Sequence, residues 1–293
     1  MQKITPFLWF DKEAGEAARF YASVFPDAKI TGTTRLPETP SGTVEIVSAE
    51  LAGLEFTLMS AGPGFTFNPT VSFLVACQAT EEVDRLWNAL RPGGSPLMDL
   101  GAYPFSARYG WIQDRYGLSW QIMLMGEHPF TQRIIPTLMF TGSLSGKAEE
   151  AINFYTSVFN DAHIDDIFRY GPGQAPDPAH TIAHAAFTLE GQSFAAMDSA
   201  RMHGIAFTEA LSFVVHCTTQ AEIDHYWDHL TADPSAEQCG WLKDKYGLSW
   251  QIVPAILPQL LQDPDPRKVA RVTEAFMGMK KFDLAGLRRA YEG

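Results

Sequence analysis

GWIQDRYGLSWQI occupies residues 110–122, and GWLKDKYGLSWQI occupies residues 240–252. Three of the thirteen positions differ, and each change is conservative. In both copies a strand-like run follows an Asp-(Arg/Lys)-Tyr-Gly sequence, which is typical of a turn whose glycine takes a positive φ. The segment therefore predicts a hairpin that occurs twice. Strand alternation places Trp120 and Ile122 on one face of its last strand and Ser119 and Gln121 on the other.

This hairpin is one part of a longer duplication. ARFYASVFPDA (18–28) matches INFYTSVFNDA (152–162), and VSFLVACQATEEVDRLWNAL (71–90) matches LSFVVHCTTQAEIDHYWDHL (211–230). Offsets of 130 to 140 residues indicate a duplicated domain, because solenoid repeats are far shorter. We expect a first domain over residues 1–126 and a second over 133–254, joined by the polar stretch GEHPFTQR (126–133) and followed by a helical tail over 255–293.

The hydrophobic pattern gives both halves the same order of elements. In the first half it predicts helices over 12–25, with Asp11 as N-cap, and 80–90, and strands over 4–10, 28–36, 43–52, 54–60, 70–77, 109–113 and 118–124. In the second half, Thr219 and Glu222 form a capping-box pair. Each half therefore repeats a β-α-β-β-β unit, and the fold class is α+β.

Composition excludes several classes of partner. The chain has 293 residues and a formal net charge of -12, so it lacks the basic surface that nucleic acids and anionic membranes require. Its three cysteines stand in no zinc-binding spacing, and no apolar run is long enough for a signal peptide or a membrane span. We expect a cytoplasmic protein whose partner is a small molecule, and the sequence leaves open whether it forms a homodimer.

These motifs resemble those of a known superfamily. The paired β-α-β-β-β units, the Phe-Tyr of the first helix and the repeated D-x-x-G-x-x-W-x-I ending are similar to the vicinal oxygen chelate superfamily, which includes glyoxalase I and extradiol dioxygenases. Within it, ITPFLWF (4–10), HAAFTLEGQSFAAMD (184–198) and CGWLKDKYGLSWQIVP (239–254) resemble the PhnB-like family, commonly described as 3-demethylubiquinone-9 3-methyltransferase. The resemblance implies tandem glyoxalase-like domains, each a curved mixed sheet around a cleft.

The resemblance also implies where a metal would bind. Metal-dependent members place a histidine on the first strand, a histidine at the start of the strand before the second helix and a glutamate on the last strand. Counting along this sequence puts those positions at Pro6 and Pro136, at Val71 and Leu211, and at Gln121 and Gln251. None of these side chains is a good ligand for a divalent cation. We therefore expect no metal site and no cofactor.

Other residues complete the predicted clefts. We expect the first cleft to contain Leu8, Phe10, Trp111, Ser119 and Gln121, and the second His184, Trp241, Ser249 and Gln251. Of these, His184 and Gln251 are the candidates for a catalytic role, because a histidine in a cleft can act as a base. His216 is expected on the helix side of its strand, in a structural role.

Three hypotheses follow. The first is a protein that binds a small organic molecule in its clefts, with any reaction independent of metal. The second is a metal-dependent lyase or dioxygenase with non-standard ligands. The third is an interaction module whose clefts are filled by side chains. Typical methyltransferase activity is disfavoured, because GPGF (62–65) and GPGQ (171–174) are the only glycine-rich candidates and neither opens a helix. Whether the chain is an enzyme stays open.

Overall fold

A computed structural model describes residues 2–39, 42–126, 130–201 and 203–293. The expected linker lies partly outside these residues, since 127–129 are not described. The chain divides into two compact units, a smaller one of residues 1–5 and 212–293 and a larger one of residues 6–211. This division does not follow the sequence duplication, because the larger unit contains most of the first half and the start of the second.

The larger unit begins with a β-α-β-β-β module. Its strands are β1 (Ile4–Phe10), β2 (Lys29–Thr39), β3 (Gly42–Leu51) and β4 (Leu54–Ser60), in the spatial order β1-β4-β3-β2, and its helix is α1 (Ala14–Val24). β1 and β4 are parallel, whereas β2, β3 and β4 are joined antiparallel, as short hairpin connections require. The N-cap of α1 is Glu13 rather than the expected Asp11, and its side chain makes no capping bond.

An eight-stranded sheet joins the two halves of the sequence. The first half contributes β5 (Val71–Cys77), β6 (Ser95–Tyr103), β7 (Ser106–Gln113) and β8 (Ser119–Leu124). The second contributes β9 (Ile134–Thr141), β10 (His163–Arg169), β11 (Ile182–Leu189) and β12 (Gln192–Ser199). The order is β10-β11-β12-β9-β5-β8-β7-β6, and β5 meets β9 antiparallel, with Ser72 opposite Thr137. The second module of one half therefore completes its sheet with the first module of the other half.

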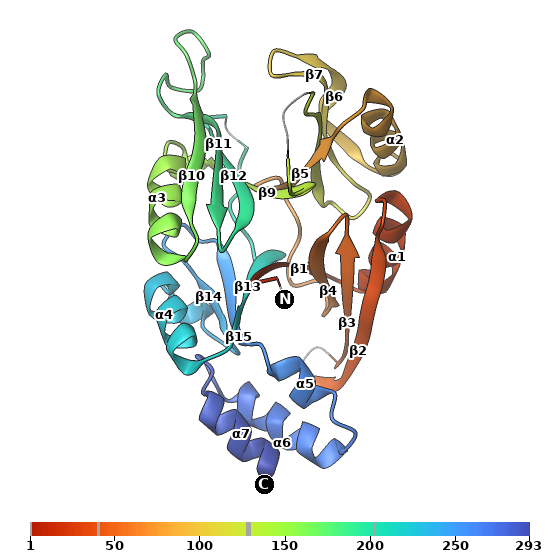
Figure 1. Ribbon diagram of the computed structural model, residues 1–293, viewed down its shortest axis with the longest axis vertical. Coiled ribbons are helices and arrows are strands. Elements are labelled where there is room, and N and C mark those ends of the chain that lie inside the picture. Colours follow the sequence, from red (N-terminus) through yellow and green to blue (C-terminus); the bar gives the residue numbers. More distant parts are fainter. Residues whose placement is uncertain (1, 40–41, 127–129, 202) are drawn as a thin grey trace. The chain divides into compact units, whose positions relative to one another are not determined.

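Helices cover the outer side of this sheet. These are α2 (Thr80–Leu90) and α3 (Ala148–Val158), visible in Figure 1 beside β6–β7 and β10–β12 respectively, and a short 3-10 helix, Gly142–Leu144, precedes α3. In the core, Phe73 and Trp120 are fully buried and their rings lie 5.4 Å apart. The Trp120 ring also contacts Tyr21 and Phe25 at and just beyond the end of α1. The tryptophan of the repeated segment is therefore a core residue.

The aspartate of the repeated segment is a buried junction. Asp114 is 3% exposed, and its Oδ1 accepts hydrogen bonds from the backbone N–H groups of Tyr116 and Leu118. Its Oδ2 accepts from the Tyr21 hydroxyl at 2.8 Å and from Trp120 Nε1 at 2.9 Å. Burial raises the pKa of this carboxyl, and the four donors oppose that rise. One side chain thus fixes the turn, the start of β8 and helix α1.

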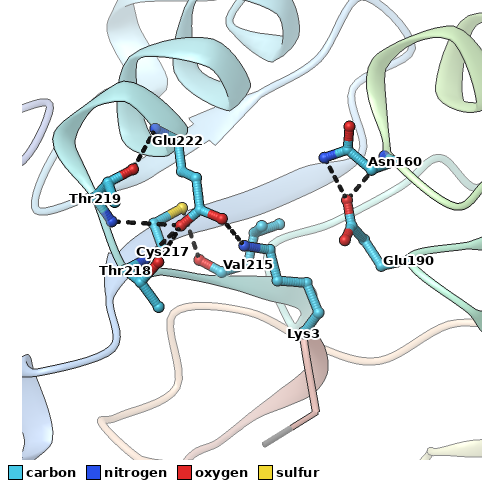
Figure 2. A network of polar contacts seen from close by, with 8 residues as sticks. All are labelled: Lys3, Asn160, Glu190, Val215, Cys217, Thr218, Thr219 and Glu222. Carbon is cyan, nitrogen blue, oxygen red and sulfur yellow. Dashed lines mark hydrogen bonds and ion pairs between the residues drawn. The ribbon is translucent and has the colours of Figure 1, made fainter.

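The smaller unit contains the second copy of the segment. Its strands are β13 (Leu211–Cys217), β14 (Trp241–Lys243) and β15 (Ser249–Pro254), in the order β14-β15-β13, and α4 (Gln220–Leu230) packs on them. The backbone N–H of His216 donates to the carbonyl of Lys3, so the first residues of the chain lie beside β13. As predicted, Thr219 and Glu222 form a capping box at α4, and Glu222 also accepts a bond from Lys3 at 2.9 Å (Figure 2).

The C-terminal tail docks on its own unit. It forms α5 (Leu257–Leu261), α6 (Pro266–Met277) and α7 (Leu284–Glu292), and the Asp283 side chain caps α7. Residues 279–280, between α6 and α7, run beside the edge at 239–240, where the N–H groups of Cys239 and Gly240 donate to the carbonyls of Met279 and Lys280 at 2.8 Å. Gly240 has a φ of +84°, and a Cβ there would lie 2.5 Å from the Phe282 ring.

The tail takes the place that β6 has in the first half. Tyr109 and Gly110 of β7 correspond to Cys239 and Gly240, and β6 covers the edge of β7. The second half has no strand equivalent to β6 among its described residues, so an uncovered edge would be left for other chains to pair with. None of the described helices is long and apolar enough to cross a membrane.

The Asp114 junction predicts a difference between two tyrosines. Tyr21→Phe removes a donor from a buried carboxylate and should lower the free energy of unfolding by about 1–3 kcal/mol. Tyr116→Phe is the control, because the Tyr116 hydroxyl bonds Glu16 at an exposed position and its loss should cost at most about 0.5 kcal/mol. Urea unfolding of both variants measures the difference, and equal costs would contradict a special role for Asp114.

Candidate ligand-binding site

The eight-stranded sheet has a second face, which we call the inner face. It is the face opposite Phe73 and Trp120, and the hydrogen bond between Gln121 and Ser72 identifies it. Register and strand alternation extend it across six strands. Its residues are Ser72, Leu74, Tyr109, Trp111, Ser119, Gln121, Met123, Thr137, Met139, His184, Ala186, Ala195 and Met197.

Gln121 is held by two neighbours on this face. The Tyr109 hydroxyl donates to Gln121 Oε1 at 2.7 Å, and Gln121 Nε2 donates to Ser72 Oγ at 2.8 Å. Gln121 is only 7% exposed, and a buried amide needs such partners. One N–H of the amide remains to donate to a further acceptor.

Thioether and aromatic side chains surround this amide. Tyr109, Trp111 and Met139 are buried together, and five partly buried residues pack against them: Met98, Tyr103, Met123, Met197 and Ile205. Trp111 Nε1 donates to Ser119 Oγ at 2.7 Å, which fixes the indole. At the β6–β7 turn the exposed Phe105 ring stacks on Tyr103, 5.6 Å away. The inner face is therefore mostly apolar and adaptable, because methionine has three rotatable bonds.

His184 lies on the same sheet as Gln121. It stands on β11 opposite Phe168 of β10, and it alternates with Ala185, whose partner is Ala196. Burial lowers the pKa of its imidazole, while the nearby Asp166 carboxylate opposes this effect. His184 is therefore mostly neutral at pH 7 and can donate or accept a hydrogen bond. His184 was expected beside Gln251, but β11 belongs to the sheet that contains Gln121, whereas Gln251 lies on β15 of the other sheet.

The polar residues on the face of Gln121 differ from the metal-ligand positions found by counting along the sequence. Ser72 and Thr137 face the amide, whereas Val71 and Pro136 alternate onto the outer face. Two hydroxyls and one amide are neutral oxygen donors and do not fit the carboxylate and imidazole preferences of divalent cations in this fold. Among the described residues, no group of three or more His, Cys, Asp or Glu side chains is arranged to hold a metal ion.

Two predicted cleft residues lie on the wrong face. Phe10 packs against Phe67 and Tyr116 on the α1 side of β1. Leu8, two residues earlier in the strand, lies on the same face and is fully buried. Both were assigned from a single apolar strand in which alternation does not distinguish the two faces. The opposite face of β1 carries Phe7 and Trp9, whose indole donates to the carbonyl of Gly62.

The smaller unit holds Trp241, Ser249 and Gln251. Gln251 Nε2 donates to Ser212 Oγ at 3.0 Å, which repeats the Gln121–Ser72 pair, and Trp241 stands opposite Gln251. His216 lies on the same face as Ser212, where its Nε2 is 3.1 Å from Thr5 Oγ1, so its expected position on the helix side is wrong. The Tyr109 position is occupied by Cys239, and no hydroxyl there can orient the amide.

The sequence analysis did not identify Ser72, Ser212 or Tyr109 as site residues. Ser72 and Ser212 occupy equivalent places in the duplicated VSF and LSF runs, and both bond the repeated glutamine. A polar residue kept in both copies of an apolar strand was the available signal. Tyr109 could have been identified from Trp111, because the two residues are two positions apart and lie on the same face of β7.

The arrangement of strands and the inner face define a glyoxalase-like protein. Glyoxalase I from Zea mays is similar in fold, with a TM-score of 0.54 at 11% identity, covering 89% of this chain and 98% of that one. A PhnB protein from Bacillus cereus, titled a 3-demethylubiquinone-9 3-methyltransferase, is 39% identical over 42% of this chain and 99% of its own, with a TM-score of 0.40. No curated protein matches the sequence.

A family model described as 3-demethylubiquinone-9 3-methyltransferase matches residues 2–123 and again 132–253. The chain therefore belongs to the family that this model describes, with two copies of the family domain in tandem.

The environment of His216 predicts a pH dependence. Burial, and then the charge of Lys3, lower its pKa from 6.5 to about 4. Between these values the unfolded chain binds a proton that the folded chain does not, so this stabilisation is complete above about pH 6.5 and is lost as the pH falls toward 4. His216→Asn should therefore flatten the decline in unfolding free energy across this range. An unchanged slope would contradict the lowered pKa.

Proposed function

We propose that the inner face of the eight-stranded sheet binds a small, uncharged and largely apolar organic molecule, without a metal ion. One observation supports this most directly. A single sheet carries the Gln121 amide on β8 and the His184 imidazole on β11, with methionine side chains on the strands between them and aromatic side chains on β7. Binding sites for small molecules commonly combine an apolar wall with a few fixed polar groups.

The chemistry of the wall favours a flat aromatic ligand. Methionine sulfur contacts the edges of aromatic rings favourably, and the rings of Tyr109 and Trp111 offer further contact area. The remaining N–H of Gln121 would donate to an acceptor oxygen on the ligand, and His184 offers a second polar contact. The residues around Gln121 carry no formal charge at pH 7, and Asp166, the partner of Ala186 on β10, is the carboxylate on the His184 side of this face, so an uncharged ligand matches the surroundings of the amide.

A metal-dependent reaction is not part of this proposal. Ser72, Thr137 and Gln121 supply only neutral oxygens, which do not compensate a divalent cation for its lost hydration as carboxylates do. The methyltransferase in the family description is not adopted either. Residues 62–65 and 171–174 lie in loops and turns, and neither stretch opens a helix that could bind the methyl donor in the usual way.

The test uses 2-methoxynaphthalene, which accepts a hydrogen bond and donates none. The side-chain indole signal of Trp111, assigned with Trp111→Phe, reports binding in ¹H–¹⁵N spectra of the full chain. Gln121→Leu should weaken binding about 2- to 10-fold, the range expected for one lost hydrogen bond. Gln251→Leu, the equivalent change in the smaller unit, is the matched control and should leave the Trp111 titration unchanged.

Two outcomes would contradict the proposal. One is a probe that leaves the Trp111 signal unmoved up to its solubility limit. The other is an affinity that rises on addition of Mn²⁺ or Zn²⁺ and falls with a chelator, which would indicate a metal site. Circular dichroism of Gln121→Leu checks that the variant folds, since Tyr109 and Ser72 lose a partner.

A further inference from the structure

The smaller unit contains one buried hydroxyl that differs from its repeat equivalent. Ser249 is fully buried, and its Oγ makes no hydrogen bond with any described residue. In the larger unit the equivalent Ser119 is also fully buried, and its Oγ accepts a bond from Trp111 Nε1 at 2.7 Å. A buried hydroxyl without a partner is unfavourable and uncommon in native structures. The serine of the repeated GLSWQ sequence therefore accepts a hydrogen bond in the larger unit and none in the smaller unit.

The difference follows from the strands beside these serines. Trp111 lies within β7, which is eight residues long and paired with β6 on its far side. Trp241 is the first residue of β14, which has three residues, and the segment before it is joined to the tail rather than to a strand. Trp241 stands opposite Gln251 as Trp111 stands opposite Gln121, yet it is partly exposed and supplies no bond to Ser249.

Ser249 faces the side of the sheet that carries the other polar groups. It stands opposite Ser212, whose Oγ accepts from Gln251 Nε2, and both share a face with His216. Gln251 is 6% exposed. In the larger unit the Tyr109 hydroxyl donates to Gln121 Oε1, and the equivalent position in the smaller unit is Cys239. Ser249 Oγ thus has no donor, and it lies two residues along the same strand from Gln251, whose Oε1 lacks the tyrosine hydroxyl donor that Gln121 has in the larger unit.

We propose that Ser249 and Gln251 form a second binding site, for a small aromatic molecule that donates a hydrogen bond through a ring N–H or O–H. The class of ligand follows from the equivalent site, where an indole N–H fills the same role for Ser119. This site is separate from the inner face of the larger unit and does not depend on the function proposed for it. It also differs in chemistry, because it selects a donor where Gln121 selects an acceptor.

The test compares indole with 1-methylindole, in which a methyl group replaces the hydrogen of the ring N–H. The Trp241 indole signal of the full ¹⁵N-labelled chain, assigned with Trp241→Phe, reports binding in the smaller unit. We expect indole to bind about 2- to 10-fold more tightly than 1-methylindole, the range expected for one hydrogen bond. Ser249→Ala should abolish this preference, and the matched Ser119→Ala should retain it.

Thermal unfolding gives a second readout that needs no ligand. Ser249→Ala should leave the Tm unchanged or raise it, because no bond is lost, whereas Ser119→Ala should lower it by depriving Trp111 of its acceptor. Equal affinities for the two indoles at Trp241 would overturn the proposal and would indicate that water satisfies Ser249. A Tm as low in Ser249→Ala as in Ser119→Ala would overturn it too, since the hydroxyl would then be bonded within the protein.

Discussion

A buried carboxylate organises the larger unit. Asp114 is almost completely removed from solvent, and an isolated charge there would be strongly unfavourable. Four donors compensate it, and they come from the turn, from the core indole of Trp120 and from Tyr21 on helix α1. Asp244 bonds the corresponding turn and indole in the smaller unit. The strand that presents the repeated glutamine starts from this junction, so the position of the amide depends on it.

Exchange of modules between the halves determines which residues can act together. β5 and β9 are apolar strands, and each resembles its equivalent in the other half of the chain. The sequence therefore does not specify which half supplies the strand that pairs with β5. The structure pairs β5 with β9, and this brings His184 onto the sheet of Gln121. The duplication, the element order and the α+β class could be predicted because they rest on local periodicity, whereas partner choice rests on long-range pairing.

The faces of a strand could be assigned from the sequence where polar and apolar residues alternate clearly. The strand that begins at Ser119 mixes polar and apolar residues, and the face of Gln121 was identified correctly. β1 and β5 are apolar on both faces, so alternation does not identify the inner side of such strands. Counting along the family pattern therefore assigned the site positions to Val71 and Pro136, each one residue away from Ser72 and Thr137, which lie on the face of Gln121. The sequence predicted a helical tail but not the break between α6 and α7, because that break depends on backbone bonds to residues 239–240 and on the packing of Phe282 against Gly240.

The pairing of the chain's first residues with β13 has a consequence for synthesis. Lys3 and Thr5 bond Glu222 and His216, which lie more than 200 residues later in the sequence. At a ribosomal rate of about 5–20 residues per second, roughly 10–40 s separate the appearance of the two partners. Residues 6–211 can complete their sheet during this interval, while the N-terminal segment has nothing of its own unit to pair with. The nascent chain therefore carries Lys3 and Thr5 without their bonding partners for tens of seconds, until residues 212–293 emerge.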